Sequence, residues 1–444
     1  MFVLILFLIF LSFISLFFGW KTKTEKDYLF NSKKTKLLPL LATLVMTEFN
    51  PATLIGFSSL GASVGAFGLL LPFVFLIGLS FYAFAVAKEW KRWDGYSVSE
   101  LFTKRYGRGL GIFSSISLLV AMIGFGASYL KAMYLVVSTV FPEINSAYFS
   151  GITILILMVW NLRGGLRSII FLDLVSFFAS IILFGVILYF SKYNSGDGFK
   201  YLLEPVQSNA LSLPFFLSLV ILTMFTYIAA PWYGQKIFSA QSEPTAFKAV
   251  LLSAFFVFLF YSIPIFVLIP EVNSYPVSLP KFLQSKLPMG WMYLSQGILF
   301  AIGVTTLSGL WSSASSMFIG DFLEKKETSS KNRASFVFFV FGVLSFLVSE
   351  ILNESVLNQL ILANIPVFAL SFSLLAGFHW KQATKLSAYL SSIVGLTWGV
   401  FCYFYFGNEG NYVVYWVLWG LPMIFVVGIL TTLIQRFNHL GQTV

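Results

Sequence analysis

The chain has 444 residues, of which 58% are hydrophobic and 10% charged, and its net charge is +10. Soluble proteins carry about 25% charged residues, so this composition excludes a soluble catalytic domain and predicts a membrane protein. The single cysteine, Cys402, excludes an internal disulfide and a cysteine-based metal site. We expect no enzyme activity, no bound cofactor and no transition metal, and we attribute the positive charge to membrane orientation rather than to a nucleic-acid partner.

Apolar segments long enough to cross the lipid bilayer, about 17–25 residues each, recur along the whole chain. About 13 spans are expected, near residues 1–20, 38–64, 67–88, 110–140, 147–162, 168–191, 211–234, 247–270, 290–320, 335–352, 358–380, 387–407 and 413–435. The first has neither a basic leading region nor a small-residue cleavage site, so we interpret it as a retained helix rather than a signal peptide.

Basic residues gather in alternate connections between the predicted spans. Most of the 28 Lys and Arg residues fall there, and the connection after the seventh span contributes Lys236 and Lys248. By the positive-inside rule these connections are cytoplasmic. The sequence therefore predicts a multi-pass protein of the plasma (cytoplasmic or inner) membrane, with its N-terminus outside and its C-terminus in the cytoplasm.

The second span contains the stretch "LVMTEFNPATLIG", in which Glu48, Asn50 and Pro51 stand close together. Pro51 removes the donor to the Thr47 carbonyl and disfavours helix at Asn50. Irregular backbone at membrane depth persists only where it is buried in protein or lines a watery cavity, and unwound carbonyls there suit a cation. The alternative is a simple proline kink, with the carboxylate snorkelling or paired to a neighbour.

The seventh span, "TMFTYIAAPWYGQ", is a second stretch interrupted by a proline, Pro231. Two interrupted spans in corresponding positions of two halves are typical of transporters built from an inverted repeat, with the binding site near the midplane. The sequence thus predicts two broken helices around one site.

Hydroxyl side chains crowd the ninth span, "AIGVTTLSGLWSSASSMFIGD". Thr305 and Thr306 can supply oxygen ligands to a small cation, or can pack against a neighbouring helix, and composition does not separate the two. For Ser312 to Ser316 we favour helix packing, because small hydroxylated residues let membrane helices approach closely.

The remaining polar residues within the spans leave alternatives open. Lys131 in the fourth span can pair with Glu48, bind an anionic group of a solute, or snorkel outward. Asp173 and Asp321 lie near cytoplasmic ends of their helices, where such residues usually anchor the interface. A place on an ion exit path is the second interpretation.

Several motifs together resemble the sodium:solute symporters, the family of bacterial proline, pantothenate and sialic acid carriers and animal sodium–glucose transporters. They occur in the family's order and spacing along nearly the whole chain: "KTEKDYLFNSKK", "YSVSELFTKRYGR", "RGGLRSIIFLDLVSF", "GQKIFSAQSEPTAFKA" and "TTLSGLWSSASSMFIGD". The resemblance implies an all-α, leucine-transporter-like fold with two inverted five-helix repeats. It places an extra helix and basic loop at 1–37, the transport core at 38–380, and two further helices and a short tail at 381–444.

The resemblance also implies roles for individual residues. Sodium would lie between the broken helix and the ninth span, with the Thr305 and Thr306 hydroxyls, the carbonyls of Met46, Phe49 and Ile302, and Glu48 around it. Asp173 matches an aspartate near the inner exit. From position, we expect the solute beside Asn50, Thr53, Tyr129, Lys131, Tyr227 and Trp232.

The expected function is sodium-coupled uptake of a small organic solute by alternating access. Thr53 and Ala230 stand where sugar-type members carry glutamine and asparagine, which favours an amino acid or an organic acid over a sugar. Two alternatives remain: a proton-coupled carrier of the same fold, with Glu48 and Lys131 as the titrating pair, and a membrane sensor that binds the solute without transporting it.

Overall fold

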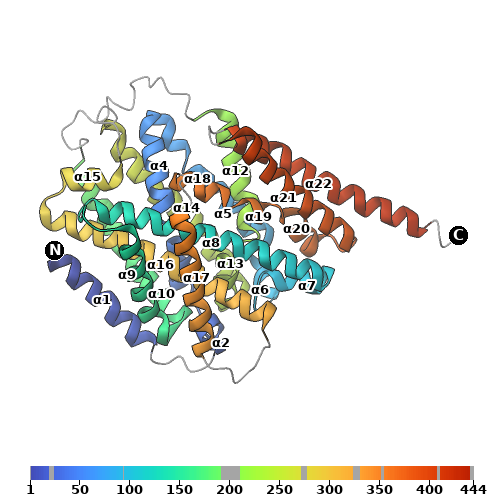
Figure 1. The fold of residues 1–444 in the computed structure, drawn as a ribbon, viewed down its shortest axis with the longest axis horizontal. Coiled ribbons are helices and arrows are strands. Elements are labelled where there is room, and N and C mark those ends of the chain that lie inside the picture. Colours follow the sequence, from blue (N-terminus) through green and yellow to red (C-terminus); the bar gives the residue numbers. More distant parts are fainter. Residues whose placement is uncertain are drawn as a thin grey trace.

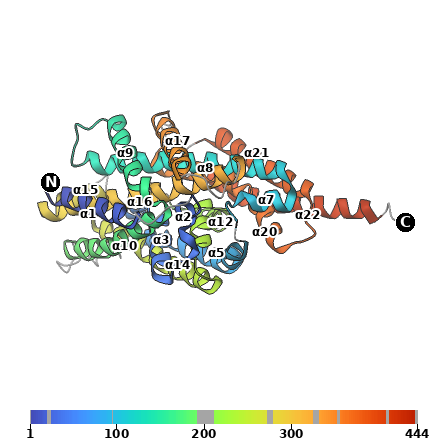
Figure 2. The same cartoon turned by 90° about the horizontal axis from the view of Figure 1, so that it is seen from below.

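The computed structural model of the chain describes residues 2–19, 25–93, 95–191, 211–271, 278–323, 331–351, 355–407 and 411–440. These residues are almost entirely helical, and their one β-bridge joins Thr35 to Ala240. Figures 1 and 2 show a bundle in which α1 lies at one end, while α21 and α22 lie at the other.

The α-helices among the described residues up to Tyr189 are numbered α1 to α10. Their bounds are α1 Phe2–Gly19, α2 Glu25–Phe30, α3 Leu37–Glu48, α4 Pro51–Ser63, α5 Phe73–Tyr82, α6 Lys88–Trp93, α7 Ser99–Tyr106, α8 Arg108–Ser138, α9 Ser146–Gly164 and α10 Leu166–Tyr189. The helices of the second half are α12 Leu213–Tyr227, α13 Pro231–Ser239, α14 Glu243–Leu268, α15 Leu279–Lys286, α16 Met289–Phe322, α17 Lys331–Ile351, α18 Val356–Leu362, α19 Ile365–Phe368, α20 Ser371–His379, α21 Lys385–Phe406 and α22 Asn411–Leu440.

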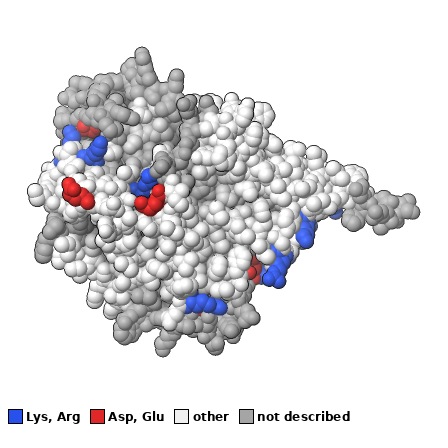
Figure 3. All heavy atoms as spheres, in the orientation of Figure 1, with Lys and Arg blue, Asp and Glu red and all other residues white. Residues whose placement is uncertain are grey.

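Eight of the described helical segments are long and apolar enough to cross a membrane, and up to 11 are if each bent pair counts as one span. Two shorter apolar helices, Ile5–Gly19 and Ser146–Asn161, lie where the first and fifth spans are expected. Large apolar side chains are exposed on the outer helices, for example Phe13 on α1, Phe404 on α21 and Trp419 on α22. In Figure 3 charged side chains are few on the visible face. The prediction of an all-helical chain with many candidate membrane spans is confirmed.

Both predicted interruptions are present. α3 and α4 meet at a bend of 62°, and α12 and α13 at a bend of 48°. At the first break Asn50 adopts an extended conformation, and its side chain caps α4 by accepting a hydrogen bond from the Thr53 backbone N–H at 2.8 Å. Proline at the first position and an asparagine cap before it together end one helix and begin the next.

A third break, which the sequence analysis did not predict, separates Val356–Phe368 from Ser371–His379 with a bend of 44°. Pro366 stands near the start of α19 and was the available signal. A proline alone does not decide the matter, because Pro264 and Pro422 lie inside the unbroken helices α14 and α22.

The helix α16 forms the centre of the bundle. The most apolar stretch of α16 is completely buried in protein, and it packs against α8, α10 and α17 as well as against the broken helices through α3 and α13. α21 and α22 pack chiefly on each other, and α22 also contacts α12. The central helix therefore presents its hydroxyl groups to both predicted breaks.

Asp321 anchors the end of α16 to α7 and α8. Its carboxylate accepts hydrogen bonds from Ser97 at 2.7 Å, from Ser115 at 2.6 Å and from Ser99. Three hydroxyl donors compensate a largely buried charge, which is the condition for such a charge to be tolerated. This geometry agrees with the anchoring interpretation of Asp321.

We expect the Asp321→Ala variant to be destabilised by about 2–3 kcal/mol, because hydrogen bonds to a charged group are worth about 1.5–3 kcal/mol and three serines lose their acceptor. Thermal unfolding of the purified protein in detergent measures this as a lower melting temperature. Glu89→Ala is the matched control, since Glu89 forms an exposed ion pair with Arg92 and should change little. Equal melting temperatures for the two variants would contradict the anchoring role.

Candidate functional site

The backbone at the first break is held by Tyr261 of α14. The Tyr261 hydroxyl donates to the Glu48 carbonyl at 2.7 Å and accepts from the Asn50 backbone N–H at 3.2 Å. The Asn50 side-chain amide donates to the same Glu48 carbonyl at 2.8 Å. The Glu48 carbonyl and the Asn50 N–H therefore have partners, and the carbonyl of Met46, whose usual donor would be the Asn50 N–H, contacts another helix.

That other helix is α16, and the contact forms the candidate cation site. The Thr306 hydroxyl lies 3.0 Å from the Met46 carbonyl oxygen and 2.8 Å from the Ile302 carbonyl oxygen. The Thr305 hydroxyl lies 3.2 Å from the same Ile302 oxygen. All four residues are buried. Carbonyl and hydroxyl oxygens each have two lone pairs. Oxygens of both kinds are ligands for a hard cation.

Two further residues proposed for the cation lie differently. Phe49 caps the end of α3, and its buried ring packs against Phe260 and Tyr261 with centroid distances of 5.3 and 5.1 Å. The Glu48 carboxylate faces a cavity and accepts a hydrogen bond from the Tyr233 hydroxyl at 3.2 Å. Of the six predicted ligand residues, Met46, Ile302, Thr305 and Thr306 are brought together by hydrogen bonds.

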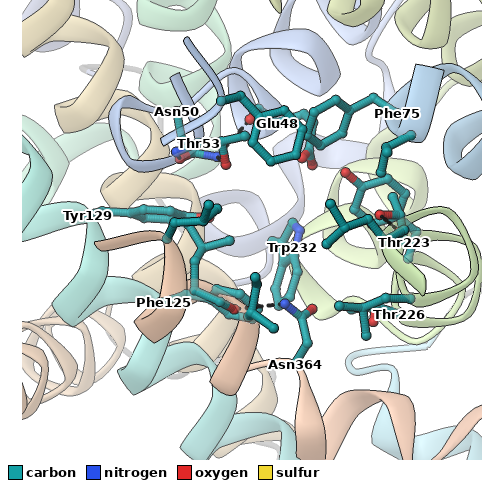
Figure 4. Close-up of a pocket in the computed structure, with 18 residues that line it drawn as sticks. Glu48, Asn50, Thr53, Phe75, Phe125, Tyr129, Thr223, Thr226, Trp232 and Asn364 are labelled. Carbon is teal, nitrogen blue, oxygen red and sulfur yellow. Dashed lines mark hydrogen bonds between the residues drawn. The ribbon is translucent and has the colours of Figure 1, made fainter. Parts of the chain in front are cut away.

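The cavity lies between the two broken helices, with α5, α8 and the third broken segment closing it. Five of the six residues predicted to contact the solute line it, together with Glu48: Asn50, Thr53, Tyr129, Tyr227 and Trp232. Figure 4 shows Glu48 facing Trp232 and Asn364 across the cavity, with Tyr129 and Thr223 on opposite sides. The cavity volume is about 70 Å³, which is room for several waters.

The cavity wall is aromatic and weakly acidic. Phe57, Phe75, Phe125, Tyr129, Tyr227 and Trp232 supply rings, and Asn50, Thr53, Thr223, Thr226 and Asn364 supply polar groups. Among the lining residues that the structure describes, Glu48 is the one charged group. Lys131, which was predicted to contact the solute, lies half-buried on α8 outside this lining.

The prediction that Lys236 lies in a cytoplasmic connection is wrong. The seventh span continues as α13 to Ser239, so Lys236 lies inside a helix and its side chain is completely buried. Its ammonium forms an ion pair with Asp173 of α10 at 3.2 Å. Asp173, predicted on an ion exit path, also accepts a hydrogen bond from the Thr43 hydroxyl.

Sequence reasoning missed Tyr233, Tyr261 and Lys236. Tyr233 and Lys236 follow Pro231 in the same short helix, which was a usable signal, whereas nothing in the sequence connects Tyr261 with a break 211 residues away. The serines of α16 behave as the packing interpretation predicts. Ser312 and Ser313 exchange hydrogen bonds with the Gln235 side chain of α13, and Ser316 donates to the Tyr96 carbonyl.

Solved transporter structures share this fold. A Na⁺-coupled sialic acid symporter in a substrate-bound, outward-open state matches with a TM-score of 0.79 and 18% identity, over 97% of this chain and 97% of that chain. A variant of the Eremococcus coleocola manganese transporter matches with a TM-score of 0.55 and 16% identity, over 90% of this chain and 95% of that chain. No protein-family model and no curated protein sequence matches this chain. The structural likeness establishes that the chain adopts the all-helical fold of these transporters.

Proposed function

We propose that the chain is a secondary active transporter that couples the entry of one small organic solute to sodium by alternating access. The observation that carries this proposal is the position of the cavity between two broken helices, with Glu48 in its lining two residues after Met46, whose carbonyl, like that of Ile302, is hydrogen-bonded to the Thr306 hydroxyl. Midplane sites built at half-helix ends are the usual arrangement in secondary transporters. Residues 38–380 would form the inverted-repeat core, with the N-terminus outside and the C-terminus in the cytoplasm.

The cavity favours a solute with a positively charged amino group. Glu48 offers a carboxylate, and rings such as those of Tyr129 and Trp232 attract cations through their faces. The first turn of α13 begins at the cavity wall, and Ala230 offers no side chain to cap it, so its backbone N–H groups suit a carboxylate. An amino acid satisfies both ends, whereas a simple organic acid would face Glu48 with a like charge.

Sodium would act by joining α3 to α16. The Thr306 hydroxyl now makes that connection with a hydrogen bond, and a cation would draw the Met46 and Ile302 carbonyls to itself instead. By linkage, the ion raises solute affinity only as far as it favours the solute-competent state. One inward charge supplies about 2.3 kcal/mol per 100 mV, which supports accumulation of the solute well beyond tenfold.

Coupling to protons through Glu48 and Lys131 receives less support from the geometry. The Glu48 carboxylate is hydrogen-bonded to the tyrosines Tyr227 and Tyr233, and Lys131 does not line the cavity. Uptake driven by a pH gradient would therefore be the result that indicates proton coupling.

The first experiment identifies the solute. Purified protein in proteoliposomes, screened with labelled amino acids, organic acids and sugars, should accumulate one or more amino acids when an inward sodium gradient is present. Uptake driven by a pH gradient in sodium-free buffer would overturn sodium coupling. Binding that shifts the melting temperature, without uptake under any gradient, would indicate a sensor.

The second experiment tests the cation site. Thr306→Ala removes the hydroxyl that bridges α3 and α16, and we expect it to raise the sodium concentration for half-maximal uptake at least tenfold, equivalent to about 1.4 kcal/mol. Thr305→Ala should act in the same direction. Thr397→Ala is the matched control, because that hydroxyl is exposed on α21 and bonds only within its own helix. Unchanged sodium dependence in both site variants would exclude this site.

The third experiment separates the role of Glu48 from that of sodium. In Glu48→Gln the carboxylate loses its charge, and we expect the affinity for the amino solute found in the screen to fall at least tenfold while half-maximal sodium stays within about twofold. Glu350→Gln provides the control, because Glu350 is exposed and bonds to Ser146 at the surface. A shift in sodium dependence at constant solute affinity would assign Glu48 to the cation instead.

A further inference from the structure

The Lys236 ammonium is completely buried, and each of its three protons has an acceptor. The Nζ atom donates to the Thr43 carbonyl at 2.9 Å, to the Thr47 hydroxyl, and to Asp173 Oδ2 at 3.2 Å. An isolated ammonium in an apolar interior is strongly unfavourable, so its position must be supported by paired charge and hydrogen bonds. Here both are supplied, by α3 and by α10.

These acceptors are the groups that bind a hard cation. A backbone carbonyl, a threonine hydroxyl and a carboxylate surround one point, as they do in protein sites for oxygen-liganded ions. The point adjoins the candidate sodium site, because Thr47 directly follows Met46 in the chain and Thr305 lies beside Asp173.

The central helix leaves space for the ammonium. Gly309 follows Thr306 by about one helical turn on α16, and a Cβ atom at Gly309 would lie 3.4 Å from Lys236 Nζ and 3.6 Å from its Cε. These distances correspond to van der Waals contact, so a side chain larger than a methyl group at position 309 would clash with the lysine. The cavity filled by the ammonium is therefore bounded by α3, α10 and α16.

We propose that Lys236 is a tethered cation, which permanently occupies a second small-cation site formed by Asp173, Thr43 and Thr47. The inference rests on the proposed cation-coupled transport, and it concerns how many ions from solution take part. A charge fixed to α13 neutralises Asp173 without entering from outside, so the chain carries one coupling ion for each solute, at Thr305 and Thr306. Asp173 is then a partner of the chain's own lysine instead of a step on an ion exit path.

Removing the tethered charge should open this second site to sodium. In the full-length protein in detergent, without solute, we would measure the melting temperature against NaCl, with choline chloride keeping the ionic strength constant. We expect Lys236→Ala to melt lower than wild type without sodium, and to gain an additional saturable rise with sodium. The number of ²²Na⁺ ions bound per chain should increase from one to two. Lys236→Gln, which keeps most of the side-chain length without the charge, should show the same gain if the alanine variant does not fold.

Controls assign the gain to Asp173. The double variant Lys236→Ala/Asp173→Asn should lose the added sodium dependence, and Lys248→Ala, which removes an exposed lysine of α14, should behave as wild type. The same sodium dependence in wild type and in the Lys236 variants would overturn the proposal, as would a gain that persists in the double variant. Absence of any sodium effect in wild type would instead count against the proposed sodium coupling, while a gain in the Lys236 variants would still support a tethered cation.

Discussion

The whole site depends on one constraint: a broken helix inside a membrane protein must find new partners for its backbone. At the first break Tyr261 supplies them to Glu48 and Asn50, and at the second the Trp90 indole donates to the Ile228 carbonyl at 2.9 Å. The bridge between Thr35 and Ala240 then ties the start of α3 to the end of α13. These contacts supply partners to backbone groups at both breaks, and residues beside the breaks line the cavity.

The two buried acidic residues Glu48 and Asp173 have separate environments. Glu48 faces the cavity, where its partners are the hydroxyl groups of Tyr227 and Tyr233. Asp173 lies deeper between helices and is matched by Lys236 and Thr43. A buried charge with a fixed counter-charge is costly to separate. The acid with neutral partners is therefore the one that suits a charged ligand.

The structural features that could be predicted from the sequence are those that depend on residues close together in the chain. A proline inside an apolar span marked each break, Pro51 in the second span and Pro231 in the seventh, and residues around those breaks line the cavity. The same reasoning fails where a residue distant in the sequence determines whether a helix breaks or a side chain is buried. Pro264 leaves its helix intact while Pro366 stands at a break, and Lys236 is buried because Asp173, on another helix, compensates its charge. Hydropathy measures how unfavourable the burial of a lysine is, but it does not reveal the carboxylate that makes it possible.

In the proposed mechanism, the short path between the cavity and the candidate cation site would let one ligand influence the other. Glu48 follows Met46 by two residues at the end of α3, so the carbonyl that contacts Thr306 and the carboxylate that lines the cavity belong to one helical turn. An ion that draws the Met46 carbonyl away from Thr306 must also shift the backbone that positions Glu48. Differential contacts of this kind are what coupling between two sites requires. Tyr261 bonds both the Glu48 carbonyl and the Asn50 N–H, so it links this turn to the residue directly before α4.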